Sequence, residues 1–128
     1  MKKHKKLSVI LFLMILAVIT GTIKYIIEYK PYLSGTYENE DKNAVLVIGD
    51  RQQGSSYGTF FVNNEVVKYI LYNKGNNFEF YDIVDNYAKM YESIYVPFNS
   101  NIFTQKITFT YDGVEYSFKK VGSSPGAL

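Results

Sequence analysis

The chain opens with a basic tail followed by a long apolar segment, and this combination restricts its structure most. Four lysines lie within residues 1–6, and an uncharged run extends from Leu7 to Ile23. Because this run is apolar on every side, it does not suit the surface of a soluble protein. Apart from Lys24 and Glu28, the apolar character continues to Tyr29, which exceeds the roughly 20 residues needed to cross a bilayer. We therefore predict a transmembrane signal-anchor helix over residues 7–29.

The charges also predict the orientation of this helix. Short, positively charged flanks stay in the cytoplasm, so the tail at 1–6 should be cytoplasmic and the residues after the span should lie outside. Tyr25, Tyr29 and Tyr32 lie where the helix would leave the lipid, an interface that amphipathic rings favour. Pro31 should end the helix. A short linker over 30–34 then leads into the exported part.

A cleaved secretory signal is the alternative, because it has the same basic start and apolar centre. Only Thr20-Gly21-Thr22 approaches the small-residue pattern of a signal peptidase site, and the chain has no cysteine for lipid attachment. The apolar run is also longer than a usual signal core, so we expect an uncleaved, single-pass anchor in the cytoplasmic membrane. Under both alternatives the remainder is exported.

Charge is distributed unevenly between the two parts of the chain. Residues 31–128 hold eight Lys and Arg against eleven Asp and Glu, so the exported part is mildly acidic. A nucleic-acid binder needs a basic face on its folded domain, and we expect no nucleic-acid partner. The abundance of Asn, Lys, Ile and Tyr is typical of AT-rich bacterial genomes, and we expect a Gram-positive source.

The exported part has the composition of an all-β domain. Residues 31–128 contain eleven Tyr and eight Phe but no Cys, so the domain must fold without disulfides. Aromatic residues are enriched in strands, and turn signals recur at a spacing of roughly 8–12 residues. We predict an antiparallel meander or small barrel of about seven or eight strands over residues 35–121.

Individual strands follow from alternation and turn residues. The strongest hairpin joins Ile102–Tyr111 to the strand after Asp112-Gly113, with Phe103 and Ile107 on the same face. The segment over 86–96 fits either a strand or a helix, with a strand favoured, and Pro97 should end either element. The small, polar tail over 122–128 should be disordered.

The first predicted strand carries a family resemblance. Leu33-Ser34-Gly35-Thr36-Tyr37, followed by an up-and-down series of strands, resembles the Gly-x-aromatic first strand of lipocalin-like small bacterial barrels. Tyr37 stands where lipocalins have Trp, and the domain is shorter than a full lipocalin. Lys119 and Lys120 are the candidate basic partners for this ring. The resemblance implies a barrel that holds a small apolar or lipid-derived ligand, although side chains can equally fill a barrel of eight strands.

The residue inventory excludes several chemistries. His4 is the only histidine and there is no cysteine, so the chain lacks His-dependent nucleophilic triads and a His/Cys zinc set. We therefore predict no catalytic residue, metal or cofactor. Clustered carboxylates remain, and a hydrolase would need two of them to converge on one bond. A calcium site in the first loop is a further alternative. These clusters are Glu38, Glu40 and Asp41; Asp82 and Asp85; and Asp112 and Glu115.

Tyrosines supply the candidate binding residues. Because Tyr is favoured at interfaces, these rings could form a surface that stacks on sugars or binds a protein. The alternative is that they are core residues and cross-strand pairs. The candidates are Tyr69, Tyr72, Tyr81, Tyr87, Tyr91 and Tyr95. The leading hypothesis is a membrane-anchored, non-enzymatic interaction module at the cell envelope, with an envelope protein or wall component as its partner. A lipocalin-like carrier is the alternative, and a carboxylate-based hydrolase is the remote one.

Overall fold

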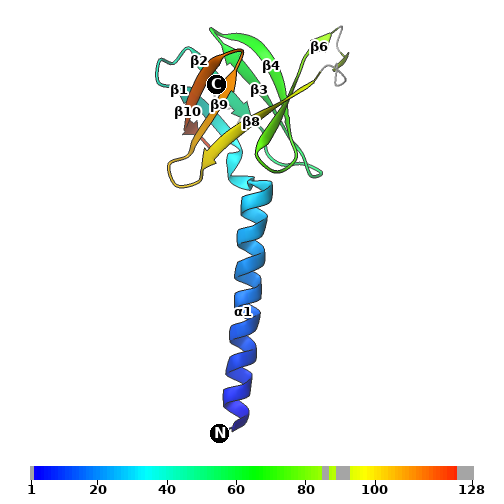
Figure 1. Cartoon of the computed structure of the whole chain (residues 1–128), viewed down its shortest axis with the longest axis vertical. Helices are drawn as coiled ribbons and strands as arrows, with labels where there is room; N and C mark the ends of the chain where they lie inside the picture. Colours follow the sequence, from blue (N-terminus) through cyan, green and yellow to red (C-terminus); the bar gives the residue numbers. More distant parts are fainter. Residues whose placement is uncertain (1, 85–86, 89–92, 124–128) are drawn as a thin grey trace.

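The computed structural model describes residues 2–84, 87–88 and 93–123, and it consists of one long helix that supports a β-barrel (Figure 1). Helix α1 spans Lys2–Tyr29 and is followed by a short 3-10 helix, η1, at Pro31–Leu33. The barrel strands are β1 (Gly35–Asn39), β2 (Ala44–Ile48), β3 (Ser56–Val62), β4 (Glu65–Tyr72), β5 (Asn77–Tyr81), β8 (Ile94–Asn101), β9 (Lys106–Tyr111) and β10 (Val114–Gly122). A separate two-stranded sheet pairs β6 (Ile83–Val84) with β7 (Tyr87–Ala88).

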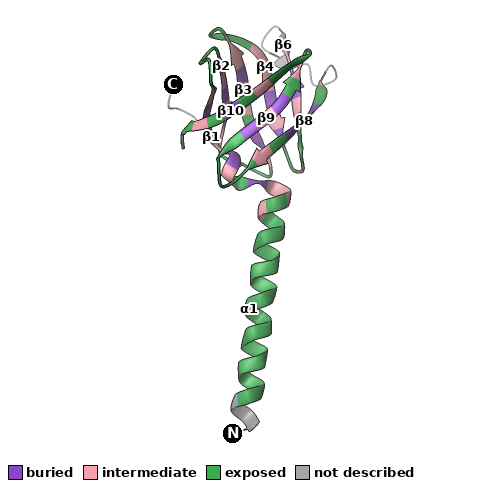
Figure 2. Ribbon diagram, turned by 60° about the vertical axis from the view of Figure 1, so that its left-hand side comes forward, coloured by how far each residue is buried: buried purple, intermediate pink, exposed green. Residues whose placement is uncertain are grey.

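The predicted fold class is confirmed. Eight antiparallel strands close in the order β1-β10-β9-β8-β5-β4-β3-β2. The stretch from Lys5 to Tyr29 forms one continuous helix that is long and apolar enough to span a membrane. Residues 5–25 are all exposed, and in Figure 2 the helix ribbon is green over most of its length, whereas the buried residues gather in and next to the barrel. An apolar surface of this kind suits lipid and not water.

Aromatic side chains fill the interior of the barrel. Phe60, Phe78, Phe80, Tyr72 and Phe118 are each at most 1% exposed. The ring of Phe60 alone contacts five other rings at centroid distances of 5.0–6.1 Å, and four of these contacts are edge-on. Such packing stabilises the barrel without a disulfide, because edge-on aromatic pairs add to the gain from burial.

The tight turns follow the predicted turn chemistry. Asp112 and Gly113 both have positive φ, and the pair Tyr111↔Val114 closes the hairpin that the Asp-Gly sequence predicts. Asn63 and Asn64 form the corresponding turn between β3 and β4.

Two details of the predicted strands are wrong. Strand β9 begins at Lys106, so Phe103 lies in a turn and is 93% exposed, not on the face of Ile107. Pro97 does not end a strand but lies inside β8. Its partner is Asn77, the first residue of β5, and the β5–β8 ladder ends at this pair. A residue without an N–H is tolerated there because the ladder to β5 stops.

Other predictions are resolved only in part. Within the segment predicted at 86–96, residues 94–96 form the start of β8, as the strand alternative predicts. Residues 85–86 and 89–92 lie outside the described residues. Strand β10 extends to Gly122, one residue beyond the predicted end of the domain, and residues 124–128 of the predicted disordered tail also lie outside the described residues.

Candidate functional site

The outer wall of β3, β4, β5 and β8 brings tyrosines together from four strands. Strand register places Tyr57 beside Leu71, Leu71 beside Glu79, and Glu79 beside Tyr95. The adjacent row pairs Tyr69 with Tyr81. Their neighbours along each strand, such as Phe78, Phe80 and Ile70, are buried in the core, so alternation directs this set outward. We call Tyr57, Tyr69, Leu71, Glu79, Tyr81 and Tyr95 the tyrosine face.

Exposure varies across the tyrosine face. Tyr95 is 72% exposed and Tyr57 is 59% exposed, while Tyr69 is half-buried and stacks on Tyr81 at a centroid distance of 6.0 Å. Tyr81 is buried outside the core, and burial raises the pKa of its hydroxyl, with smaller contributions from Tyr57, Tyr69 and Glu79. The stacked Tyr69–Tyr81 pair is therefore the less exposed part of the face, and the rings of Tyr57 and Tyr95 are its exposed part.

Glu79 supplies a carboxylate in the middle of these rings. Its Oε1 accepts a hydrogen bond from Ser93 Oγ at 2.8 Å, which orients the side chain along the wall. Aromatic faces attract cations and stack on flat groups, and a carboxylate accepts hydrogen bonds from donors. The tyrosine face therefore suits a partner that presents cationic or hydroxyl-rich groups.

The predicted tyrosines do not all lie on this face. Tyr69, Tyr81 and Tyr95 do, whereas Tyr72 points into the barrel and packs on Phe78 and Phe98. Tyr72 shares its strand face with the buried Ile70, so it belongs to the core. Tyr87 lies in β7, but its side chain is not described, and Tyr91 lies outside the described residues.

Sequence reasoning missed Tyr57, Leu71 and Glu79. The alternation of Tyr57 and Thr59 with the buried Phe60 was the available signal for Tyr57. The sequence alone does not show that β3 and β8 flank the β4–β5 pair. That placement depends on the order of strands in the closed barrel.

The end of α1 is capped by Lys30 and by residues of the barrel. The last four carbonyl groups of a helix have no partner within the helix. Here Ile26 O accepts from Lys30 N at 3.0 Å, and Ile27 O accepts from Lys30 Nζ at 2.6 Å. Glu28 O accepts from Gly75 N at 2.7 Å and from Tyr72 Oη at 3.2 Å.

Arg51 completes this cap from the loop between β2 and β3. Its Nη1 donates to Tyr29 O at 3.3 Å, and its Nη2 donates to the carbonyls of Gly54 and Asn73 at 2.7 and 2.6 Å. The guanidinium also lies over the Tyr29 ring, 4.9 Å from its centroid. Two barrel loops, Tyr72 at the end of β4 and Lys30 thus hold the helix end, and we call these contacts the helix–barrel junction. The barrel is joined to α1 by a structured contact and not by a free linker.

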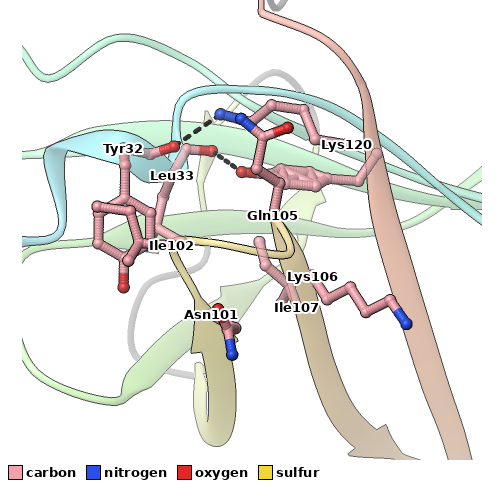
Figure 3. Close-up of a pocket in the computed structure, with 9 residues that line it drawn as sticks. Tyr32, Leu33, Asn101, Ile102, Gln105, Lys106, Ile107 and Lys120 are labelled. Atoms are coloured by element: carbon pink, nitrogen blue, oxygen red, sulfur yellow. Dashed lines mark hydrogen bonds between the residues drawn. The ribbon is translucent and has the colours of Figure 1, made fainter.

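Lys120, which Figure 3 shows beside Tyr32 and Leu33 of η1, and Tyr37 lie at the same end of the barrel. Lys120 Nζ donates to Tyr32 O at 2.7 Å and lies 5.5 Å from the centroid of the Tyr37 ring. Tyr37 Oη donates to Leu33 O at 2.6 Å. Burial lowers the pKa of Lys120 and raises that of Tyr37. The space between these groups is a small cavity of about 60 Å³, which suits water and not a lipid-sized ligand.

The described carboxylates are distributed over several strands and turns, and Glu38 and Glu40 line one surface pocket beside β10. Asp82 pairs with Lys68 at 2.6 Å, and Glu38 lies beside Lys119 in the β1–β10 ladder. Asp112 and Glu115 lie at the β9–β10 hairpin. Within the described ranges, no group of three or more His, Cys, Asp or Glu side chains could hold a metal ion.

Comparison with known proteins identifies no relative: no family model, curated protein or solved structure matches this chain.

Proposed function

We propose that this chain is a single-pass membrane protein whose barrel acts as an interaction module at the outer face of a bacterial cytoplasmic membrane. The observation that carries the proposal is the tyrosine face, which exposes aromatic rings on the outside of a barrel whose interior is already filled. With the interior occupied, binding is left to the outer surface. Tyr is among the residues most enriched in binding hot spots.

The orientation follows from the charges that flank α1. The lysines of residues 2–6 favour a cytoplasmic tail, and Tyr25 and Tyr29 suit the opposite interface. The helix–barrel junction joins the carbonyls of Glu28 and Tyr29 to Gly75, Tyr72 and Arg51, so the last turn of α1 is held against the barrel.

The junction restricts where a partner is met. Only Lys30 separates α1 from η1, and barrel loops contact the last turn of the helix. The barrel therefore stays close to the lipid, and its wall faces sideways over the membrane. A second membrane protein or the innermost layer of the cell wall lies within its reach.

Site-specific photocrosslinking tests this proposal. A benzoylphenylalanine at Tyr95 should crosslink to a defined envelope component in intact cells. The same group at Ser117, an exposed site on β10, is the control and should not. Replacing Tyr57 with Ser should weaken capture by roughly 5- to 30-fold, the effect of losing about 1–2 kcal/mol at a hot spot. Equal crosslinking from Tyr95 and Ser117, or none from either, would contradict the proposal.

A lipocalin-like carrier is the second candidate, and one observation favours it. The resemblance implies a basic residue against the first-strand ring, and Lys120 lies over Tyr37 in this way. A ligand inside the barrel would have to displace fully buried rings such as Phe60 and Phe80. Titration of the full-length chain in micelles with an apolar fluorophore separates the two candidates, because saturable one-to-one binding favours the carrier.

A carboxylate-based hydrolase is the remote alternative. It needs two carboxylates that flank one bond at a separation of roughly 5–9.5 Å. Glu38 lies beside Lys119 and Asp82 pairs with Lys68, and a carboxylate with a basic neighbour stays ionised and is a poor general acid, which supports the non-enzymatic proposal instead.

A further inference from the structure

Phe103 is held in the open by a turn of fixed shape. The ring is 93% exposed, more than any other large apolar side chain among the described residues. Asn101 Oδ1 accepts hydrogen bonds from Phe103 N at 2.9 Å and Thr104 N at 3.1 Å. At the other end of the turn, Lys120 N donates to Gln105 O at 3.0 Å. These bonds fix the backbone on both sides of the ring, so Phe103 is kept outward.

The turn lies at the end of the barrel that faces α1. Figure 1 shows the loop between β8 and β9 descending to the level of the top of the helix. Tyr32, in η1, lies close by, since its hydroxyl is 2.9 Å from Ser100 Oγ. Ile102, beside Phe103, is 41% exposed and also lines the small cavity with Tyr32. The exposed pair thus lies next to the point where the chain leaves the helix.

We propose that Phe103 and Ile102 insert into the outer membrane–water interface and give the barrel a second lipid contact beside α1. This inference rests on the proposed membrane anchoring of α1. The exposed pair lies beside η1, which follows the helix directly, and two exposed lysines at the same end, Lys106 and Lys74, the latter paired with Glu28 of α1, suit the headgroup layer. One Phe and one Ile are far smaller than the roughly 800 Å² per partner of a stable protein interface, whereas single apolar residues suffice to contact lipid.

A second contact has a consequence for the tyrosine face. A helix alone leaves the molecule free to tilt away from the membrane normal. Two lipid contacts restrict the tilt, so the tyrosine face keeps a defined angle to the membrane plane.

The absence of tryptophan from the chain allows a direct test. Three full-length variants each carry one tryptophan: F103W in the turn, F12W within the apolar run and V114W at the far end of the barrel. Each is reconstituted into phosphatidylcholine vesicles with brominated acyl chains, and fluorescence is quenched from the lipid side or by aqueous acrylamide. Near-UV circular dichroism verifies that each barrel is folded. Because Phe103 and Val114 are both exposed, neither substitution disturbs the core.

The proposal predicts that brominated lipid quenches F103W less than F12W but clearly more than V114W, with a blue shift relative to V114W. An F103W signal as open to acrylamide as that of V114W would overturn the inference and leave the anchor intact. Protection of F103W from acrylamide without quenching by lipid would also overturn it, because a protein contact would then cover the turn. An F12W signal that lipid does not quench would instead refute the anchoring itself.

Discussion

Replacing Phe60 with alanine tests the claim that aromatic side chains fill the barrel. Phe60 is fully buried, and its ring lies 5.0 Å from Tyr116 and 5.3 Å from Phe109 between centroids. Rings of Phe80, Tyr111 and Phe118 contact it as well. No other described ring has as many aromatic neighbours as Phe60 and Phe109, so this substitution removes much of the packing in one step.

The expected loss follows from the burial. Replacing a buried Phe by Ala costs about 3–5 kcal/mol, and the spread depends on how well the site collapses. Contacts from five surrounding rings resist collapse, and each edge-on pair contributes about 0.5–1.5 kcal/mol beyond its area. We therefore expect F60A to lower the free energy of unfolding by about 4–5 kcal/mol, out of a total of about 5–15 kcal/mol for a domain. The midpoint of thermal unfolding should fall by roughly 20 °C or more.

Urea unfolding of the full-length chain in non-ionic micelles, followed by the near-UV dichroism of the tyrosines, measures this loss. F103A is the matched control, because it is the same substitution at a ring that is 93% exposed, and it should change stability by less than about 0.5 kcal/mol. A loss below about 1 kcal/mol for F60A, or equal losses for F60A and F103A, would refute the filled interior. A hollow barrel that could take a ligand would then become the better account.

Three further predictions concern strand contact, the helix–barrel junction and pH. A Cβ at Gly58 would lie 2.2 Å from the carbonyl oxygen of Val47, so G58A should destabilise the barrel by more than about 2 kcal/mol in the same urea assay. The control is G21A, which should not destabilise it, because a Cβ at Gly21 would meet nothing within 4 Å. R51M removes bonds to the carbonyls of Tyr29, Gly54 and Asn73 and should cost about 1–3 kcal/mol; a loss below about 0.5 kcal/mol would contradict the cap. Burial raises the pKa of Tyr37 and of Tyr72 above the ordinary value of 10.0, so the unfolded chain loses these protons first as pH rises. The free energy of unfolding should therefore be unchanged below about pH 10 and fall above it by up to about 1.4 kcal/mol per pH unit for each residue. If all tyrosine hydroxyls of the folded chain lost their protons near pH 10, this reasoning would be wrong.

Local patterns predicted much of this fold. The Asp112-Gly113 hairpin could be placed because two positive φ angles suit those residues and apolar residues alternate on both sides. The helix over 7–29 was equally clear from composition. The same alternation failed at Phe103, since a run can continue into a turn whose shape depends on a side chain such as Asn101.

The candidate site was less predictable, for a physical reason. Alternation shows that Ile70 and Tyr72 share one face of a strand, but it does not show which face is inside. The structure directs Tyr72 inward and Tyr69 outward, so the predicted tyrosines divide between the core and the tyrosine face. The contribution of Tyr57 depends on strand order, and the cap from Arg51 depends on a loop that lies far from α1 in sequence.

Cysteine labelling in intact cells tests the central claim most directly, namely that α1 spans the membrane and presents the barrel outside. The chain has no cysteine, so E115C in the barrel and K3C in the tail each introduce a single thiol. A membrane-impermeant maleimide should label E115C in intact cells and K3C only after permeabilisation, with α1 retained in the labelled product. Labelling of K3C from outside, or protection of E115C until the cells are opened, would contradict the account.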